Sequence, residues 1–418
     1  MEHVQTLVLG AGIVGVCSAL HLQAMGREVM LMDRAAPGSG TSHGNAGLIE
    51  RSSVVPYAFP HNFGRLLRYA LNREPDVRYS LRHLPAIAPK LWAYWRHSSP
   101  AGLASAAQAM LPLVQQCVTE HDKLIEAAGL SHLVSNGGWM EVFRQPEDFA
   151  AAVAEEAALS QHGLRTRVLE GEQLRAQEPA LSAGAVGAIH WQDPTTVNDP
   201  GALTRGYAGL FERRGGTLRL AEAKWLFHTG THWVVDTPGG PISSDEVVVA
   251  MGPQANTLLE PLGYRIPLFI KRGYHMHYQP IPGYELRQPI CDPQGGYVLA
   301  PMAAGVRLTT GIEFAASDAP PNDIQLQRCE ALARRIYPLG ERIDLQPWLG
   351  LRPCLPDMRP VIGPAGRHPG LWFNFGHAHH GLTLGPVSGR LLAQMMTGQP
   401  LLADPQPYAP GRFNQACS

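Results

Sequence analysis

Three glycines and one aspartate near the start of the chain have the types and spacing of a nucleotide-binding turn. Gly10, Gly12 and Gly15 follow an apolar run that ends at Leu9, and Asp33 closes the next apolar run. The first glycine allows a tight strand-to-helix turn, the second lets the backbone approach a pyrophosphate, and the third lets the helix pack on the strand. A carboxylate about 20 residues further on can accept hydrogen bonds from ribose hydroxyls. The pattern predicts binding of an adenine dinucleotide, but alone it does not choose between NAD and FAD.

The elements that must position these residues are a strand, a helix and a second strand. Residues 4–9 predict a buried parallel strand, residues 13–24 carry apolar side chains at helical spacing, and residues 29–32 predict the next strand. Gly26 is expected to end the helix. The N-terminus of this helix then directs its N–H groups at the phosphates.

Three further stretches could reach the same ligand. The segment RAAPGSGTSHGNAGLI, residues 34–49, is rich in Gly, Ser and Asn, and it cannot be the crossover helix that an NAD-binding unit normally forms there. Near the other end, residues 371–375 predict a strand, residues 376–381 a tight turn, and a helix is expected to start near Gly385. In the middle of the chain, residues 247–250 predict a buried strand that is followed by Gly252.

These separated stretches resemble segments of the D-amino-acid oxidase superfamily of FAD-dependent amine oxidoreductases, and most closely those of its bacterial D-amino-acid dehydrogenases. The matching sequences are TSHGNAGL in the first loop, DEVVVAMGPQANTLL in the middle, and WLGLRPCLPDMRPVIG with GLWFNFGHAHHGLTLGP near the end, so the resemblance covers essentially the whole chain. It implies FAD as the cofactor. The positions that it implies for FAD binding are Gly10, Gly12, Ile13, Val14, Gly15, Asp33, Arg34, Thr41, Ser42, Asn45, Ala46, Gly47, Leu48, Ala223, Ala250, Gly252, Gly376, His377, Gly381, Leu382 and Thr383.

The resemblance also implies residues that contact the substrate. Arg352, in GLRPCLPD, matches the arginine that binds the substrate carboxylate in glycine-oxidase and D-amino-acid-oxidase relatives, and a guanidinium is a good fork for a carboxylate. Tyr297 resembles a tyrosine that helps to hold that carboxylate, and His43 resembles the histidine of sarcosine-oxidase-like members. Tyr274 and His277 are further candidates. The alternatives are a surface position for Arg352 and His43, and core packing for Tyr274 and His277.

The fold predicted is α/β, of the glycine oxidase and D-amino-acid oxidase type. A discontinuous Rossmann-like FAD-binding domain is assigned to residues 1–80, 198–262 and 346–418, and an antiparallel-sheet substrate-binding domain to residues 81–197 and 263–345. Alternation predicts a strand at residues 269–278, and residues 295–314 predict a hairpin that turns around residues 303–305.

The function implied is oxidative deamination of an amino acid or secondary amine that carries a carboxylate. Hydride passes from the α-carbon to flavin N5, and water hydrolyses the resulting imine to a keto acid and ammonia. A D-amino acid, including a D-proline-like ring amine, is the expected substrate. The main alternative is a glycine- or sarcosine-type oxidase that passes electrons to oxygen. An NAD-dependent dehydrogenase and an RNA-modification or binding role are further alternatives, and the formal net charge of −1 disfavours a nucleic-acid partner.

Composition limits the setting. The six cysteines are widely separated with no CxxC pair, which predicts reduced thiols in the cytoplasm. The N-terminus has no basic region with a cleavage site, and no apolar stretch reaches the roughly 18 residues that span a bilayer. Three histidines lie at 377, 379 and 380, but no carboxylate or cysteine lies at ligand spacing from them, so no metal is expected.

Residues 54–97 combine aromatic side chains with seven basic ones. Core packing with extended arginine stems explains this composition. The alternative is a surface that meets a membrane or a quinone, as in membrane-associated dehydrogenases of the superfamily. That alternative predicts a quinone or another electron-transfer partner as acceptor, and peripheral contact with the inner face of a membrane.

Overall fold

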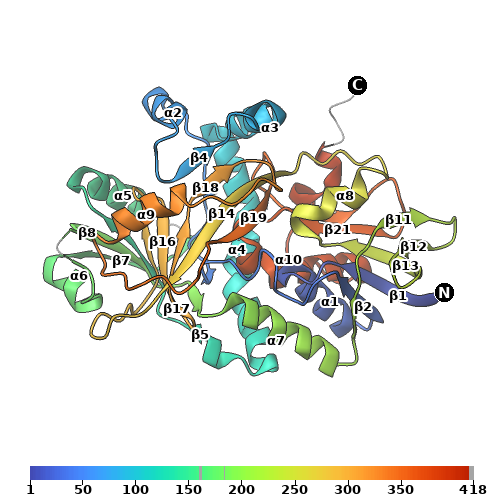
Figure 1. Ribbon diagram of the computed structural model, residues 1–418. Coiled ribbons are helices and arrows are strands. Elements are labelled where there is room, and N and C mark those ends of the chain that lie inside the picture. The colour runs from blue at the N-terminus through green and yellow to red at the C-terminus, as the bar shows by residue number, and fades with distance from the viewer. Residues whose placement is uncertain (160–161, 183, 414–418) are drawn as a thin grey trace.

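An eight-stranded sheet carries the glycine-rich turn at its centre, on the right of Figure 1. The computed structural model describes residues 1–159, 162–182 and 184–413. The strands of this first sheet are β1 (Glu2–Leu9), β2 (Val29–Asp33), β10 (Thr217–Leu220), β11 (Trp225–His228), β12 (Trp233–Asp236), β13 (Ile242–Val249), β20 (Val361–Pro364) and β21 (Leu371–Phe375). The strands predicted around the nucleotide turn are confirmed.

The central strands of this sheet are parallel. β1 pairs in parallel with β2 and with β13, and β13 pairs in parallel with β21. Their carboxyl ends therefore meet at one edge, where ligands bind in open α/β sheets. Gly10, Arg34, Ala250 and Gly376 each follow one of these four strands directly, so residues far apart in sequence lie at the same edge.

A second, ten-stranded sheet lies on the left of Figure 1. Most of its pairs are antiparallel, as predicted, but β15 pairs in parallel with β6, and β18 in parallel with β4. The predicted strand and hairpin are confirmed as β14, β16 and β17. The strands are β4 (Val77–Tyr79), β6 (Trp139–Phe143), β7 (Thr166–Glu170), β8 (Gly187–Trp191), β14 (Phe269–Tyr278), β15 (Ile290–Asp292), β16 (Tyr297–Met302), β17 (Gly305–Thr310), β18 (Ile312–Phe314) and β19 (Trp348–Cys354).

A small sheet of β3 (Leu48–Ile49), β9 (Thr195–Val197) and β5 (Val134–Ser135) completes the strands, and helices cover the sheets. The helices are α1 (Ile13–Ala24), α2 (Phe63–Ala70), α3 (Leu84–His97), α4 (Pro100–Ala128), α5 (Pro146–Leu159), α6 (Gly171–Gln177), α7 (Pro200–Arg213), α8 (Ala255–Leu259), α9 (Ile324–Ala333) and α10 (Gly381–Thr397). Short 3₁₀ turns are η1 (Ser131–Leu133), η3 (Gly252–Gln254), η4 (Gln406–Tyr408) and η5 (Pro410–Phe413).

Helix α10 begins at Gly381, four residues before the predicted start near Gly385. Pro386 therefore lies inside the helix, where it cannot donate to the carbonyl of Leu382. His121 of α4 donates its Nε2–H to that carbonyl at 2.7 Å, so the freed acceptor is satisfied. Gly389 lets α10 approach α1 closely, because a Cβ there would lie 2.8 Å from the Cys17 backbone.

Strand pairing connects parts of the two predicted domains. β4 and β19 belong to the second sheet, although both lie within segments assigned to the FAD-binding domain. The long helix α4, assigned to the substrate-binding domain, packs against α10 and α7 of the other half. The division into two domains stays a prediction, and these contacts join segments that it assigns to different domains.

The five cysteines within the described ranges are free thiols, and Cys417 lies outside those ranges. Among the helices of residues 1–159, 162–182 and 184–413, none has both the length and the apolar character needed to cross a bilayer.

Candidate active site

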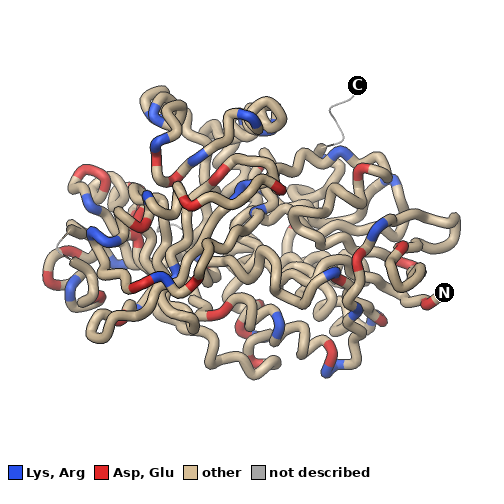
Figure 2. Tube along the Cα trace, in the orientation of Figure 1, with Lys and Arg blue, Asp and Glu red and all other residues tan. Residues whose placement is uncertain are grey.

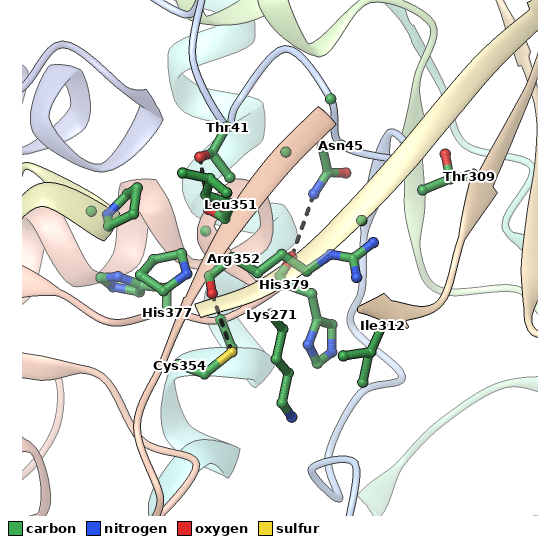
Figure 3. Close-up of a pocket in the computed structure, with 18 of the residues that line it drawn as sticks. Thr41, Asn45, Lys271, Thr309, Ile312, Leu351, Arg352, Cys354, His377 and His379 are labelled. Atoms are coloured by element: carbon green, nitrogen blue, oxygen red, sulfur yellow. Dashed lines mark hydrogen bonds between the residues drawn. The ribbon is translucent and has the colours of Figure 1, made fainter. Parts of the chain in front are cut away.

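One cavity of about 990 Å³ extends from the carboxyl edge of the first sheet to β14, β16 and β19 of the second. This volume is at the upper end of the roughly 300–1,000 Å³ found for small-molecule and cofactor sites. Figure 3 shows part of its lining, with Arg352 crossing between the two loops that precede β3 and α10. The cavity thus joins a nucleotide end to a substrate end.

The nucleotide end is built from backbone. Gly10 has φ +106°, and a Cβ there would lie 2.5 Å from the Ala250 carbonyl oxygen, so a larger residue does not fit. Gly12 caps α1 without a side-chain hydrogen bond, and the Ile13 N–H donates to Ser42 Oγ at 3.0 Å. The Asp33 carboxylate lines the cavity and accepts from the Ala11 N–H at 2.6 Å. The N-terminus of α1 lines the cavity, and a helix N-terminus fits the pyrophosphate of FAD.

Both cofactor loops are tied to β19 on either side of Arg352. Thr41 donates its hydroxyl to the Leu351 carbonyl at 2.9 Å, and the Ala378 N–H donates to the Pro353 carbonyl at 2.8 Å. Asn45 joins the two loops by donating to the His379 carbonyl at 3.4 Å (Figure 3). The position of Arg352 is therefore fixed directly by the loops that line the cofactor end.

Hydrogen bonds fix the Arg352 side chain, but no acidic side chain among the described residues neutralises its charge. Its guanidinium donates to the carbonyls of Gly311 at 2.6 Å and Thr310 at 3.0 Å, and it lies over Gly273, where a Cβ would come within 2.4 Å of Nη2. Within the described part of the chain, no carboxylate oxygen lies within 4.0 Å of it. Burial lowers the pKa of this guanidinium. A charge in this state lacks the partner that buried charges normally require.

Two carboxyl groups also face the cavity without a Lys or Arg partner among the described residues. Glu50 follows β3 directly, and Glu141 lies on β6. Burial raises the pKa of each to about 7. Both groups can therefore ionise near neutral pH when a cation approaches, and sequence reasoning missed both because neither belongs to a motif.

A buried arginine that the sequence did not single out holds the first loop. Arg307 of β17 donates through Nη1 to the carbonyls of His43 at 3.0 Å and Asn45 at 2.6 Å, and its Nε donates to His277 Nε2 at 3.0 Å. His277 in turn donates its Nδ1–H to Asp344 at 2.8 Å. Burial lowers the pKa of Arg307 to about 10, so the guanidinium remains charged at neutral pH.

The structure brings most of the predicted cofactor residues to the cavity, but four lie behind its lining. Gly15 packs on the Gly10 carbonyl, Gly47 packs on the Val197 carbonyl, and Thr383 donates to the Leu48 carbonyl. These three support the loops from behind. Ala223 lies after the edge strand β10 and packs in the core of the first sheet, away from the cavity.

Three of the predicted substrate residues use their polar groups elsewhere. His43 lies outside the lining, with its ring against Trp348 and His275. Tyr274 lines the cavity, but its hydroxyl donates to Glu313 at 2.5 Å. His277 belongs to the chain of hydrogen bonds that ends at Arg307.

Tyr297 is a cavity residue with a deeply buried ring. Its hydroxyl has no hydrogen-bond partner among the described atoms, and burial beside Asp292 raises its pKa. Its predicted contact with a substrate carboxylate stays a prediction.

His377 and His380 of the histidine run are buried, and burial lowers the pKa of His377 to about 3 and that of His380 to about 4. Folding brings the Glu50 carboxylate close to it: ligand atoms of Glu50, His379 and His380 lie within 4.8 Å of one another. Sequence spacing therefore did not reveal this carboxylate, because Glu50 lies 330 residues before His380 in the chain. The expectation of no metal stays a prediction.

The cavity, the backbone donors at α1 and the two loops define a flavin-dependent oxidoreductase, and the chain belongs to the FAD-dependent oxidoreductase family, whose model matches residues 5–395. The cofactor is FAD, as the sequence predicted. A D-amino acid dehydrogenase from Chromohalobacter salexigens is 29% identical, with 96% of this chain and 97% of the relative covered. A D-amino acid dehydrogenase from Cereibacter sphaeroides is 31% identical, with 94% and 92% covered.

Solved structures support the fold class. Glycine oxidase from Geobacillus kaustophilus superposes with a TM-score of 0.74 at 19% identity and covers 99% of this chain and 100% of its own. L-proline dehydrogenase from P. horikoshii gives a TM-score of 0.74 at 20% identity, with 99% and 98% covered. The predicted glycine oxidase type of fold is confirmed.

The Arg307 contacts predict a weaker cofactor site in Arg307→Met. The loop carbonyls of His43 and Asn45 would lose a charged donor, so the Kd for FAD should rise about ten- to a hundredfold, the usual worth of a hydrogen bond to a charged group. Flavin fluorescence titration measures this. Arg205→Met, at an exposed arginine, is the matched control and should bind FAD normally. An unchanged Kd in Arg307→Met would show that the loop does not need the clamp.

The raised pKa of Glu141 predicts that folding stability depends on pH at this position. The folded pKa is about 7 against an ordinary 4.5, so the contribution of this group is complete below pH 4.5 and is lost as pH rises through 7. Glu141→Gln, which stays neutral, should exceed the native chain by about 2–3 kcal/mol at pH 8 and match it near pH 4.5. Urea unfolding measures the difference. Glu147→Gln, on the exposed face of α5, should show no such pH dependence.

Proposed function

We propose that this protein oxidatively deaminates an amino acid, and that the substrate is a D-amino acid or a D-proline-like ring amine. Bound FAD supplies a two-electron acceptor for the hydride of the α-carbon, and water then hydrolyses the imine product. The task of the protein is to bind the amino acid in one orientation and to exclude competing geometries.

The observation that carries this proposal is the uncompensated charge of Arg352. Within the described residues, the polar contacts of this partly buried guanidinium are two backbone carbonyls, so N–H groups remain to be offered, and a carboxylate accepts from such a fork in two places. Because the hydrogen bonds of Leu351 and Pro353 attach the same strand to both cofactor loops, a carboxylate bound there lies at a fixed position relative to the flavin site.

The two carboxyl groups suit the other end of an amino acid. Glu50 and Glu141 line the same cavity from β3 and β6, on elements distinct from the strand of Arg352. An arriving ammonium group would favour their ionised form. A cavity with a cation on one element and acids on others complements a zwitterion. A glycine- or sarcosine-type oxidase would use the same arrangement with oxygen as the acceptor.

Arg352→Leu tests the proposal. The apparent KM for the best amino acid should rise about ten- to a hundredfold, because a hydrogen bond to a charged group is lost. The yellow flavin spectrum should remain, because FAD contacts other residues. A panel of D- and L-amino acids and ring amines, assayed by anaerobic flavin bleaching, identifies the substrate first. Unaltered kinetics in Arg352→Leu, with Arg205→Leu as the matched control, would remove the basis of the assignment.

We further propose that the electron acceptor is a membrane quinone. Helices α2 and α3 project from the top of the molecule in Figure 1, and α2 buries none of its residues. Residues 61–97 contain seven basic and two acidic residues, and Figure 2 marks basic positions on these elements. We call the α2–α3 surface the set of apolar side chains there that are more than half exposed: Phe63, Leu67, Leu71, Leu81 and Trp92.

The α2–α3 surface adjoins the cavity, because Leu66, Tyr69 and Leu91 of the same two helices line it. Exposed apolar side chains among arginines suit an anionic bilayer surface, where each basic residue contributes about 1 kcal/mol. A quinone dissolved in that bilayer would then enter beside the cavity. This arrangement supports a dehydrogenase rather than an oxygen-dependent oxidase.

Vesicle co-sedimentation tests this surface. The protein should pellet with phosphatidylglycerol vesicles at low salt and stay in solution with phosphatidylcholine vesicles. Arg68→Glu with Arg73→Glu should weaken binding at least about tenfold, since two favourable charges become unfavourable. Phe63→Ser with Trp92→Ser should also weaken it, while Leu345→Ser, at an exposed leucine outside the surface, should not. Equal partition to both vesicle types would contradict the proposal.

A further inference from the structure

Lys271 is a second cation in the same cavity as Arg352, and it is buried. The two residues are direct partners in the antiparallel pair of β14 and β19, so their side chains leave the same face of the sheet. Both line the cavity, and Lys271 is 9% exposed. Like charges directly opposite each other destabilise a sheet, so this pair is costly unless something anionic lies between or beside them.

The chain neutralises the neighbouring cation on the other face. Arg272, the next residue of β14, pairs through Nε with Glu313 at 3.1 Å and donates to the carbonyls of Ala316 and Ala319. On the cavity face, no carboxylate oxygen of the described ranges lies within 4.0 Å of Lys271. Strand β14 therefore carries one cation that is paired with an acid, Arg272, and one that no acid of the described residues contacts, Lys271.

Aromatic rings hold the Lys271 ammonium in place without neutralising it. Its Nζ lies 4.1 Å from the centroid of the Tyr94 ring and 5.7 Å from that of Phe269. Cation–π contacts of this kind stabilise a cation but leave N–H donors available to an anion. The ammonium is thus ordered before any ligand arrives.

Arg352 and Lys271 place their charges at two separate positions in the cavity. Arg352 is fixed by the Thr310 and Gly311 carbonyls, whereas Lys271 extends toward Tyr94 from the next strand. Figure 3 shows the two side chains leaving their strands in different directions. If the substrate carboxylate binds Arg352, the Lys271 ammonium remains for another anionic group of the same molecule.

We propose that Lys271 forms a subsite for a second anionic group, so that the preferred substrates are acidic amino acids or amines that carry two carboxylates. This inference rests on the proposed function, because it assigns the α-carboxylate to Arg352. The subsite would discriminate by charge between substrates of equal size. The aromatic wall of Tyr94 and Phe269 would contact the methylene groups between the two carboxylates.

Anaerobic flavin reduction of the FAD-loaded protein tests the subsite with isosteric pairs. D-Glutamate should reduce the flavin about ten- to a hundredfold more efficiently than D-glutamine, and D-aspartate more efficiently than D-asparagine, the usual advantage of one charge-assisted hydrogen bond. Lys271→Met should abolish this preference, because it should slow D-glutamate more than it slows D-glutamine or D-alanine. Lys271→Arg should keep most of it. Lys224→Met, at an exposed lysine, should match the native chain.

The possible failures are distinguishable. If neutral amino acids reduce the flavin but the acidic and amide members of each pair react equally in the native protein, the subsite is wrong and the proposed function stands. If Lys271→Met loses FAD or slows D-alanine as much as D-glutamate, Lys271 serves the cofactor or the fold, and the subsite is again wrong. If no amino acid of either configuration reduces the flavin, the proposed function itself fails.

Discussion

A partly buried guanidinium that meets no carboxylate among the described residues is the constraint on which the rest of this structure depends. Arg352 is fixed by two carbonyls at the β17–β18 junction, and its strand is fixed by hydrogen bonds from both cofactor loops. A charge of this kind is tolerated when a ligand supplies the counter-ion, and removing the partner of a buried charge strongly destabilises the folded state. Arg272 forms a structural ion pair with Glu313, whereas Arg352 belongs to a site in which a ligand would supply the counter-ion.

Much of the first sheet and of the cofactor end could be predicted from sequence. Gly10, Asp33, Ala250 and Gly376 each lie at or next to the end of an apolar strand, and strands of that kind pair in parallel and align their carboxyl ends. Local signals therefore predicted the strands, and the resemblance to the family brought the four distant segments together at one cofactor. Helix α10 begins four residues before the predicted start near Gly385, and a histidine from α4 satisfies the carbonyl that Pro386 leaves free inside the helix.

The roles of the candidate substrate residues depend on side-chain partners from other strands, and no local sequence pattern identifies those partners. The Tyr274 hydroxyl donates to Glu313, and the His277 ring accepts a hydrogen bond from Arg307, so the polar groups of both candidates are engaged within the protein. Lys271, Glu50, Glu141 and Arg307 belong to no motif, so spacing did not identify them. A usable signal existed in the alternation of residues 269–278, which puts Lys271 on the face opposite to Arg272 and Tyr274.

Strand β19 has a mechanical consequence. It belongs to the second sheet, yet the residues on both sides of Arg352 are bonded to loops of the first. If one sheet shifted relative to the other, Arg352 and the two loops that line the flavin site would therefore move together. Strand β7, at the far edge of the second sheet, makes no such connection, so changes in its length or sequence need not alter the distance that a hydride has to cross.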